Sequence, residues 1–137
     1  MFWIGWRVGQ VVAARYGWGT HMGIVTGFDR WGRPLVTSNS MAAGCVVEEP
    51  IAEFARDSAP ENRGFPSKLT RAEVVRRARS QLGQPYGLLT NNCEHLVSFA
   101  LGRTRESPQA QRAVAVALVT LFAILGSSGD GADGAYA

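Results

Sequence analysis

Apolar and polar positions alternate along the first half of the chain in the pattern of β-strands. Short runs of apolar and β-branched residues, separated by turns that contain glycine or proline, predict four strands in this half. The predicted strands are Val8–Ala14, His21–Phe28, Leu35–Asn39 and Gly44–Glu49. In the second strand, a period of two places His21 and Gly23 on the same face. Because Gly23 has no side chain, a helix N-terminus could approach this face closely.

The second half of the chain changes to a helical period. A short helix suits Ile51–Ala55, and residues 56–68 are predicted to form a polar surface loop. Thr70 and Glu73 have the spacing of a capping box, which predicts a helix that runs to about Leu82. Strands followed by helices predict an α+β domain, with an antiparallel sheet of about four strands packed on helices.

The stretch Asn91–Gly102 has the features of a complete helix. It begins with asparagines that favour helix capping and ends at a glycine that favours termination. Helical spacing puts five residues on one apolar face: Cys93, Leu96, Val97, Ala100 and Leu101. The thiol of Cys93 therefore points toward the core at the helix end that favours a thiolate and could receive an oxyanion. A small buried hydrophobic residue is an equally good interpretation of this cysteine.

Residues 113–126 are apolar around the whole helix circumference rather than on one face. As a helix this segment would be about 21 Å long, against about 30 Å for the hydrocarbon core of a bilayer. It is interpreted as a buried C-terminal helix or as a membrane contact, and a small domain has little room to bury a helix on all sides. The patterns divide the chain into a folded domain at 1–109, an apolar candidate membrane anchor at 110–128, and a flexible tail at 129–137.

Composition narrows the function classes. The 137 residues suffice for one domain with a core, and the formal net charge of +3 is mild. The basic residues lack the aromatic-interleaved pattern of nucleic-acid-binding proteins, whereas a basic surface near an apolar tail suits an anionic membrane. Two cysteines and two histidines show no metal or disulfide pattern, so no metal or other cofactor is expected. The expected location is the cytoplasm or the cytoplasmic face of a membrane, with the C-terminal segment membrane-associated.

Two side chains are candidates for cysteine-dependent acyl transfer, which needs a thiol nucleophile, a base and an oxyanion site. His95 lies two residues after Cys93, about 200° around a helix, so their side chains diverge and His95 is predicted to be structural. His21 lies on a strand beside Gly23, where a helix N-terminus could approach it. We therefore predict Cys93 as the nucleophile and His21 as the general base. Without the cysteine, His21 would be interpreted as an ordinary strand histidine.

Three motifs follow one another along the chain. They are His-Met-Gly-Ile-Val-Thr-Gly from His21, Gly-Cys-Val-Val-Glu-Glu-Pro from Gly44, and Asn-Asn-Cys-Glu-His-Leu-Val from Asn91. Together they resemble the lecithin:retinol acyltransferase family, which includes the HRAS-like suppressor phospholipases and acyltransferases, over about Val8 to Gln109. The Asn-Cys-Glu-His block is highly specific to this family. The resemblance implies a circularly permuted papain-like fold and a thioester route, in which the cysteine takes an acyl chain from a phospholipid and passes it to an amine, an alcohol or water.

The chain departs from the family pattern at two positions. Members usually carry a second histidine on the next strand that orients the first, and the matching position is Ser38, followed by Asn39. Ser38 or Asn39 could orient the imidazole by accepting its N–H, but neither adds charge. Members also tend to have a tyrosine two residues before the strand histidine, where this chain has Gly19. Tyr16 is the candidate that replaces it as an oxyanion donor.

Three functions are compatible with these observations. The block around Cys93, with His21 and the apolar segment, favours a thiol acyltransferase or phospholipase that acts on phospholipid or another acyl lipid at a membrane, with activity reduced by the missing second histidine. The permuted papain-like fold also hosts peptidases and amidases. Ser38 and Gly19 favour a third function, a membrane-associated interaction module that kept the scaffold and lost activity.

Overall fold

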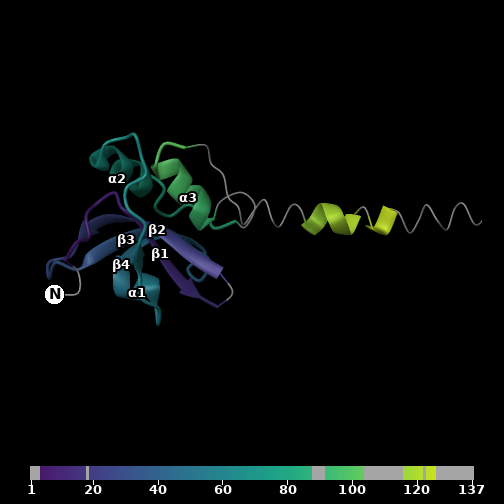
Figure 1. Cartoon of the computed structure of the whole chain (residues 1–137), viewed down its shortest axis with the longest axis horizontal. Helices are drawn as coiled ribbons and strands as arrows, with labels where there is room; N and C mark the ends of the chain where they lie inside the picture. Colours follow the sequence, from purple (N-terminus) through teal and green to yellow (C-terminus); the bar gives the residue numbers. More distant parts are fainter. Residues whose placement is uncertain (1–3, 18, 88–91, 104–115, 122, 126–137) are drawn as a thin grey trace, which may run out of the picture.

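The centre of the protein is a five-stranded antiparallel sheet in the order β4-β3-β2-β1-β5 (Figure 1). The computed structural model describes residues 4–17, 19–87, 92–103, 116–121 and 123–125. The strands are β1 (Val11–Tyr16), β2 (Gly19–Phe28), β3 (Pro34–Ser40), β4 (Cys45–Pro50) and β5 (Glu61–Asn62). The helices packed on the sheet are α1 (Ile51–Ala55), α2 (Arg71–Arg79) and α3 (Cys93–Ala100). The α+β class is as predicted, with one strand more than expected.

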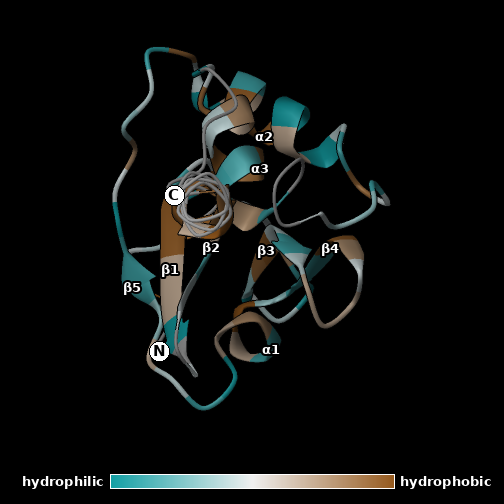
Figure 2. Cartoon of the chain, turned by 90° about the vertical axis from the view of Figure 1, so that its right-hand side faces the viewer, coloured by the Kyte–Doolittle hydropathy of each residue, from teal (hydrophilic) through white to brown (hydrophobic). Residues whose placement is uncertain are grey.

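The additional strand, β5, lies inside the segment predicted to be a loop. Glu61 and Asn62 pair with Ala13 and Val12 at the edge of β1, and Figure 2 shows β5 as a hydrophilic segment beside that strand. Both residues are exposed, so no alternation of apolar and polar positions could mark them as a strand. The pairing exists because β1 offers an open edge, which is a property of the assembled sheet.

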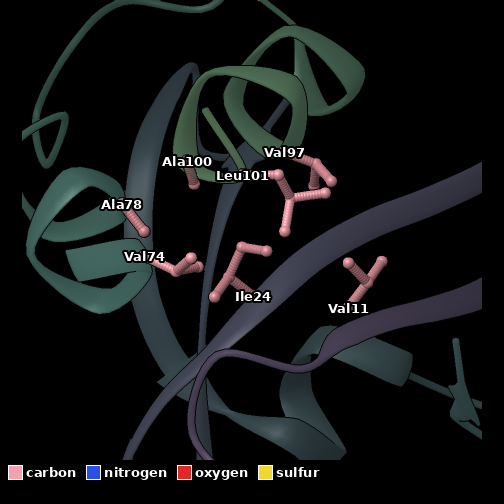
Figure 3. Close-up of a cluster of buried hydrophobic side chains, with 7 residues drawn as sticks. All are labelled: Val11, Ile24, Val74, Ala78, Val97, Ala100 and Leu101. Carbon is pink, nitrogen blue, oxygen red and sulfur yellow. The ribbon is translucent and has the colours of Figure 1, made fainter. Parts of the chain in front are cut away.

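The sheet buries both of its faces. One face packs against α2 and α3 through a cluster of apolar side chains, which Figure 3 shows: Val11, Ile24, Val74, Ala78, Val97, Ala100 and Leu101. The other face packs against α1 through a second cluster: Val12, Ala14, Val25, Val36, Ile51, Phe54 and Ala55. Successive residues of β1 and β2 supply opposite clusters, as expected from the alternation of strand side chains. Figure 1 shows α1 on one side of the strands and both longer helices on the other.

The predicted N-termini of the helices are confirmed, whereas the predicted C-terminus of α2 is wrong. Thr70 caps α2 by accepting the N–H of Glu73, as predicted, but the Glu73 carboxylate binds Arg76 within the helix. The helix ends at Arg79, and Leu82 is 43% exposed rather than part of the apolar face. In α3 the whole predicted apolar face is buried.

The apolar C-terminal segment is described only in part. Residues 116–121 and 123–125 have helical backbone, and their apolar side chains are exposed, with Val119 at 70%. They join neither core cluster, so a buried position in the core is wrong for these residues. Among the described residues, no helix has both the length and the hydrophobicity needed to cross a bilayer. The rest of 110–128 and the predicted tail at 129–137 lie outside the described residues.

Candidate active site

His21 lies near the start of β2, opposite Ala14 of β1, and its side chain is only 7% exposed. Its imidazole stacks on the ring of Phe54 in α1, with ring centroids 4.5 Å apart and an interplanar angle of 27°. The expectation that the cysteine helix approaches this face of β2 is therefore wrong, because α1 occupies it. The residue pattern of α1 gave no sign of this, since a phenylalanine in a short helix is indistinguishable from an ordinary core residue.

Gly23 allows α1 to pack this closely. A Cβ atom at this position would lie 2.6 Å from the Val36 side chain, 2.9 Å from the Thr37 carbonyl oxygen and 3.2 Å from the Phe54 ring. The prediction that a small residue beside His21 permits a close helix approach is thus right in principle. The helix that uses the space is α1, and it contributes an aromatic side chain rather than a helix end.

Ser38 of β3 contacts the imidazole directly. The Nε2 atom of His21 and the Oγ atom of Ser38 are 3.1 Å apart, and Ser38 is fully buried. If Nε2 carries the proton, it donates to Ser38 and Nδ1 becomes the proton-accepting nitrogen. Asn39, the other candidate, follows Ser38 on the strand and points to the opposite face by alternation. Ser38 is therefore in a position to orient the imidazole.

Cys93 reaches the same strand from the other side of the sheet. It is the first residue of α3 and 6% exposed, and its thiol lies close enough to the peptide N–H of Met22, the residue after His21, for this N–H to lower the thiol pKa. The paired register of β2 and β3 ends at Ile24 and Thr37, so Met22 lies outside the paired part of the two strands. The sulfur is thus placed at the strand backbone, one residue from His21.

The N-terminus of α3 is held by a capping box. The side chain of Asn92 accepts the N–H groups of Glu94 and His95, and the Nδ1 atom of His95 accepts the N–H of Asn92 at 3.2 Å. His95 therefore has the structural role that its position predicted, with an N–H group as partner. Because Asn92 takes the N–H groups of Glu94 and His95, the N–H of Cys93 is the donor at this helix end that the cap does not use.

Burial dominates the electrostatics of both candidate groups. Burial raises the pKa of the Cys93 thiol, the nearby Glu94 carboxylate raises it further, and the N–H groups of Met22, Glu94 and Cys93 itself act in the opposite direction. The helix end favours the thiolate as predicted, but its effect is smaller than that of burial. Burial and, second, the charge of Arg56 lower the pKa of His21 from 6.5 to about 4. At neutral pH the thiol and the imidazole are both uncharged.

The remaining candidates lie around this centre. Tyr16 ends β1 opposite Gly19, and its side chain lies outside the described part of the chain. Arg56 follows α1 with a φ of 53°, which is uncommon for a residue other than glycine. Cys45 begins β4, is partly buried and has no assigned role. Within the described residues, no group of three or more histidine, cysteine or acidic side chains could hold a metal ion.

Two groups near the sulfur and the imidazole escaped the sequence analysis. The Met22 N–H is a backbone group, and every residue offers one, so only the separation of β2 from β3 reveals it. Arg56 belongs to the segment predicted as a surface loop. Its charge lowers the pKa of His21, and this effect depends on the folded structure. The only signal for Met22 in the sequence is that it follows His21 in the motif.

Comparisons with known proteins agree on one family. The family model for lecithin retinol acyltransferase matches residues 9–104, more than two thirds of the chain. Curated proteins named lecithin retinol acyltransferase from Mus musculus, Rattus norvegicus and Homo sapiens are 53%, 51% and 49% identical to this chain over 45 residues. That stretch is 32% of this chain and 20% of each relative, so the match spans about a fifth of the length of these relatives.

Proposed function

Because the chain belongs to the lecithin retinol acyltransferase family, we propose that it is a cysteine-dependent acyltransferase or phospholipase with a thioester intermediate. The observation that carries the proposal is the position of the Cys93 thiol at the N–H of Met22, next to His21. Cys93 is the nucleophile and His21 the general base. Ser38 is the group that orients the imidazole.

In the first half-reaction the Cys93 sulfur attacks the carbonyl carbon of an ester. Since the thiol is protonated at rest, the S–H proton moves to His21 as the carbon–sulfur bond forms. In this mechanism the Nε2–H group of His21 donates a hydrogen bond to the Ser38 hydroxyl, so Nδ1 is the nitrogen that receives the proton from sulfur. The tetrahedral intermediate then collapses, the carbon–oxygen bond breaks, and His21 returns the proton to the departing alkoxide. An acyl thioester remains on Cys93.

The second half-reaction runs the same steps with an acceptor. An amine, an alcohol or water attacks the thioester carbonyl, and His21 takes its proton. The carbon–sulfur bond then breaks, and the departing Cys93 thiolate takes that proton from His21, which restores the starting state. In both halves the negative oxygen needs donors close to the sulfur, and the N–H groups of Met22 and Cys93 both act there. We propose this pair of backbone donors for the oxyanion contact, and Tyr16 stays a candidate donor from the sequence.

The proposed acyl donor is a phospholipid or another acyl lipid at a membrane surface. Support comes from the family and from the exposed apolar side chains of residues 116–121 and 123–125. Such an exposed apolar segment favours contact with lipid over contact with water. The proposed location is therefore a membrane surface, on its cytoplasmic side, with the domain at 1–109 carrying the chemistry.

The decisive experiment compares Cys93→Ala with Cys45→Ala. Both cysteines are replaced by the same residue, but only Cys93 lies at the Met22 N–H. Cys93→Ala should abolish fatty acid release from phosphatidylcholine vesicles and the formation of a fatty acyl adduct, whereas Cys45→Ala should keep both. Equal turnover by wild type and Cys93→Ala would reject the proposal. A peptidyl rather than fatty acyl adduct on Cys93, seen by mass spectrometry, would replace it with the peptidase or amidase alternative.

A non-catalytic module is the second candidate, because burial raises the pKa of Cys93 and Ser38 stands where the family has a histidine. The test is the pH dependence of Cys93 alkylation by iodoacetamide, with His21→Gln as the comparison. A catalytic pair should lose reactivity at neutral pH when His21 is replaced, because the base is gone. Reactivity that follows only the ionisation of the thiol, and is identical in His21→Gln, would favour the module.

A further inference from the structure

We propose that Phe54 is a positioning residue for the reaction, because its ring fixes the plane of the His21 imidazole, which contacts Ser38. The inference rests on the proposed function and adds a residue from α1 to it. Phe54 touches no reacting atom in this account. It acts through His21, on which it stacks at 4.5 Å.

The geometry of the contact supports this role. A hydrogen bond from one ring atom, such as the 3.1 Å contact of Nε2 with Ser38, fixes one point of the imidazole. It does not fix the ring plane, since rotation about the bond that joins an aromatic ring to its Cβ is broad. A second flat surface at an interplanar angle of 27° restricts this rotation. The hydrogen bond and the stacked ring together define both position and plane.

The fold provides for this contact at two further positions. Phe54 is 1% exposed and belongs to the core cluster on the α1 face, so its own ring is held firmly. Gly23 has no side chain, and a Cβ there would come within 3.2 Å of the Phe54 ring and still closer to Val36 and Thr37. The missing side chain at Gly23 thus leaves the space in which the Phe54 ring packs beside His21.

The groups that face His21 from the surrounding elements make a neutral ring the working state. Ser38 of β3 contacts the imidazole, Ala14 of β1 lies opposite His21, and neither residue carries a charge. Arg56, two residues after Phe54, is the charged group whose field reaches the imidazole, and it disfavours protonation. Removal of the Phe54 ring would admit water beside His21 and ease its protonation.

The test uses the full chain and begins with the wild type, before any Phe54 variant. The chain has two histidines, so the His21 signals are assigned by comparison with His21→Gln. In the wild type, the carbon-bound imidazole protons of His21 should show an upfield ring-current shift relative to the unfolded chain. If the signals of these protons show no upfield ring-current shift, the stacked contact is wrong. This result does not depend on whether any Phe54 variant folds.

Three variants then separate positioning from packing. Phe54→Leu removes the flat ring, Phe54→Tyr keeps it, and Ile51→Val trims a fully buried residue of the same helix and cluster. Phe54→Leu should raise the His21 pKa by at least about one unit and lower kcat about tenfold, with KM nearly unchanged. Phe54→Tyr and Ile51→Val should leave the His21 titration as in the wild type.

The outcomes distinguish this inference from the proposed function. If Cys93-dependent lipid turnover exists but Phe54→Leu changes the His21 titration and kcat no more than Ile51→Val does, the positioning role is wrong and the enzyme proposal stands. If the wild type shows the ring-current shift and Phe54→Leu raises the His21 pKa, but no Cys93-dependent turnover is found, the contact is real and the enzyme proposal fails.

Discussion

The imidazole of His21 couples the stability of the fold to pH. Its pKa is lowered from 6.5 to about 4 in the folded chain, first by burial and then by Arg56. Between these two values the unfolded chain binds more protons than the folded chain, so stability rises with pH. The contribution of His21 is fully present above about pH 6.5 and is lost as pH falls toward 4, by at most about 3 kcal/mol.

Urea unfolding at several pH values from 7 to 5 measures this effect, because few carboxylates titrate in that range. The wild type should lose stability toward pH 5 more steeply than His21→Gln, which has no imidazole at this position and keeps His95 as a common background. Identical slopes for the two proteins would show that the His21 ring is not held neutral. The result does not depend on any substrate.

Ser38 shows how far sequence reasoning reaches at the scale of a residue. The resemblance to the family marked Ser38 or Asn39 as the partner of His21, because they stand where members have a second histidine. The motif could not choose between them, since the choice depends on which face of β3 turns toward β2. The 3.1 Å contact with Nε2 supports Ser38 as the orienting residue in the proposed mechanism. The pKa of Cys93 also lay beyond the sequence, because burial is a property of the assembled core.

At the scale of elements, Gly23 sets the distance between the sheet and α1. Gly23→Ala would bring a methyl group within 2.6 Å of the Val36 side chain and 2.9 Å of the Thr37 carbonyl oxygen. The rigid strand backbone cannot move away at low cost, so we expect a loss of roughly 2 to 3 kcal/mol in the free energy of unfolding. Guanidinium unfolding followed by circular dichroism measures it.

The same strand supplies a matched control. Gly19→Ala places its methyl group in open space, with no atom within 4 Å, and should change stability by no more than about 0.5 kcal/mol. If both variants were equally stable, the close packing of α1 against His21 would be wrong. Helix propensity is not involved in either case, because both positions lie in β2.

The elements that periodicity predicted are those with a regular apolar face. The strands around the hairpins, the short α1 and the apolar face of α3 follow from spacing and capping residues. Periodicity did not predict β5, which pairs with the open edge of β1. It also placed the cysteine helix beside His21, where the structure has α1. Spacing says which residues share a face, whereas which element covers that face depends on the chain path. The position of Gly23 correctly predicted close packing at this face, but it could not show that Phe54 is the residue that packs there.

At the scale of the whole molecule, the candidate site draws its residues from both faces of the sheet. His21 is held on the α1 face, while α3 packs on the opposite face and brings Cys93 to the backbone of β2. This is feasible because β2 and β3 stop pairing beyond Ile24 and Thr37, so a helix end can reach the strand from the side. The two helical layers therefore contact successive residues of β2, α1 at His21 and α3 at Met22.

The division of the chain at about Gln109 can be tested by removing residues 110–137. Both core clusters draw their residues from between Val11 and Leu101, and the described side chains after residue 115 are exposed. A chain that ends at Gln109 should therefore fold with an unchanged unfolding midpoint and hydrolyse a soluble short-chain ester at the wild-type rate. On phosphatidylcholine vesicles its turnover should fall at least about tenfold, since even one Leu-sized side chain lost from lipid contact weakens binding by that factor.

A full-length control separates hydrophobicity from length. Val119 and Leu125 are 70% and 57% exposed, so replacing both with glutamate keeps the chain length and should not disturb the domain. We expect this double variant to behave as the shortened chain does, with vesicle sedimentation and fatty acid release reduced together. Wild-type turnover on vesicles by either protein would contradict a membrane role for the apolar segment. Loss of activity on the soluble ester would instead mean that the domain needs this segment to fold, because its active centre would then be damaged in solution.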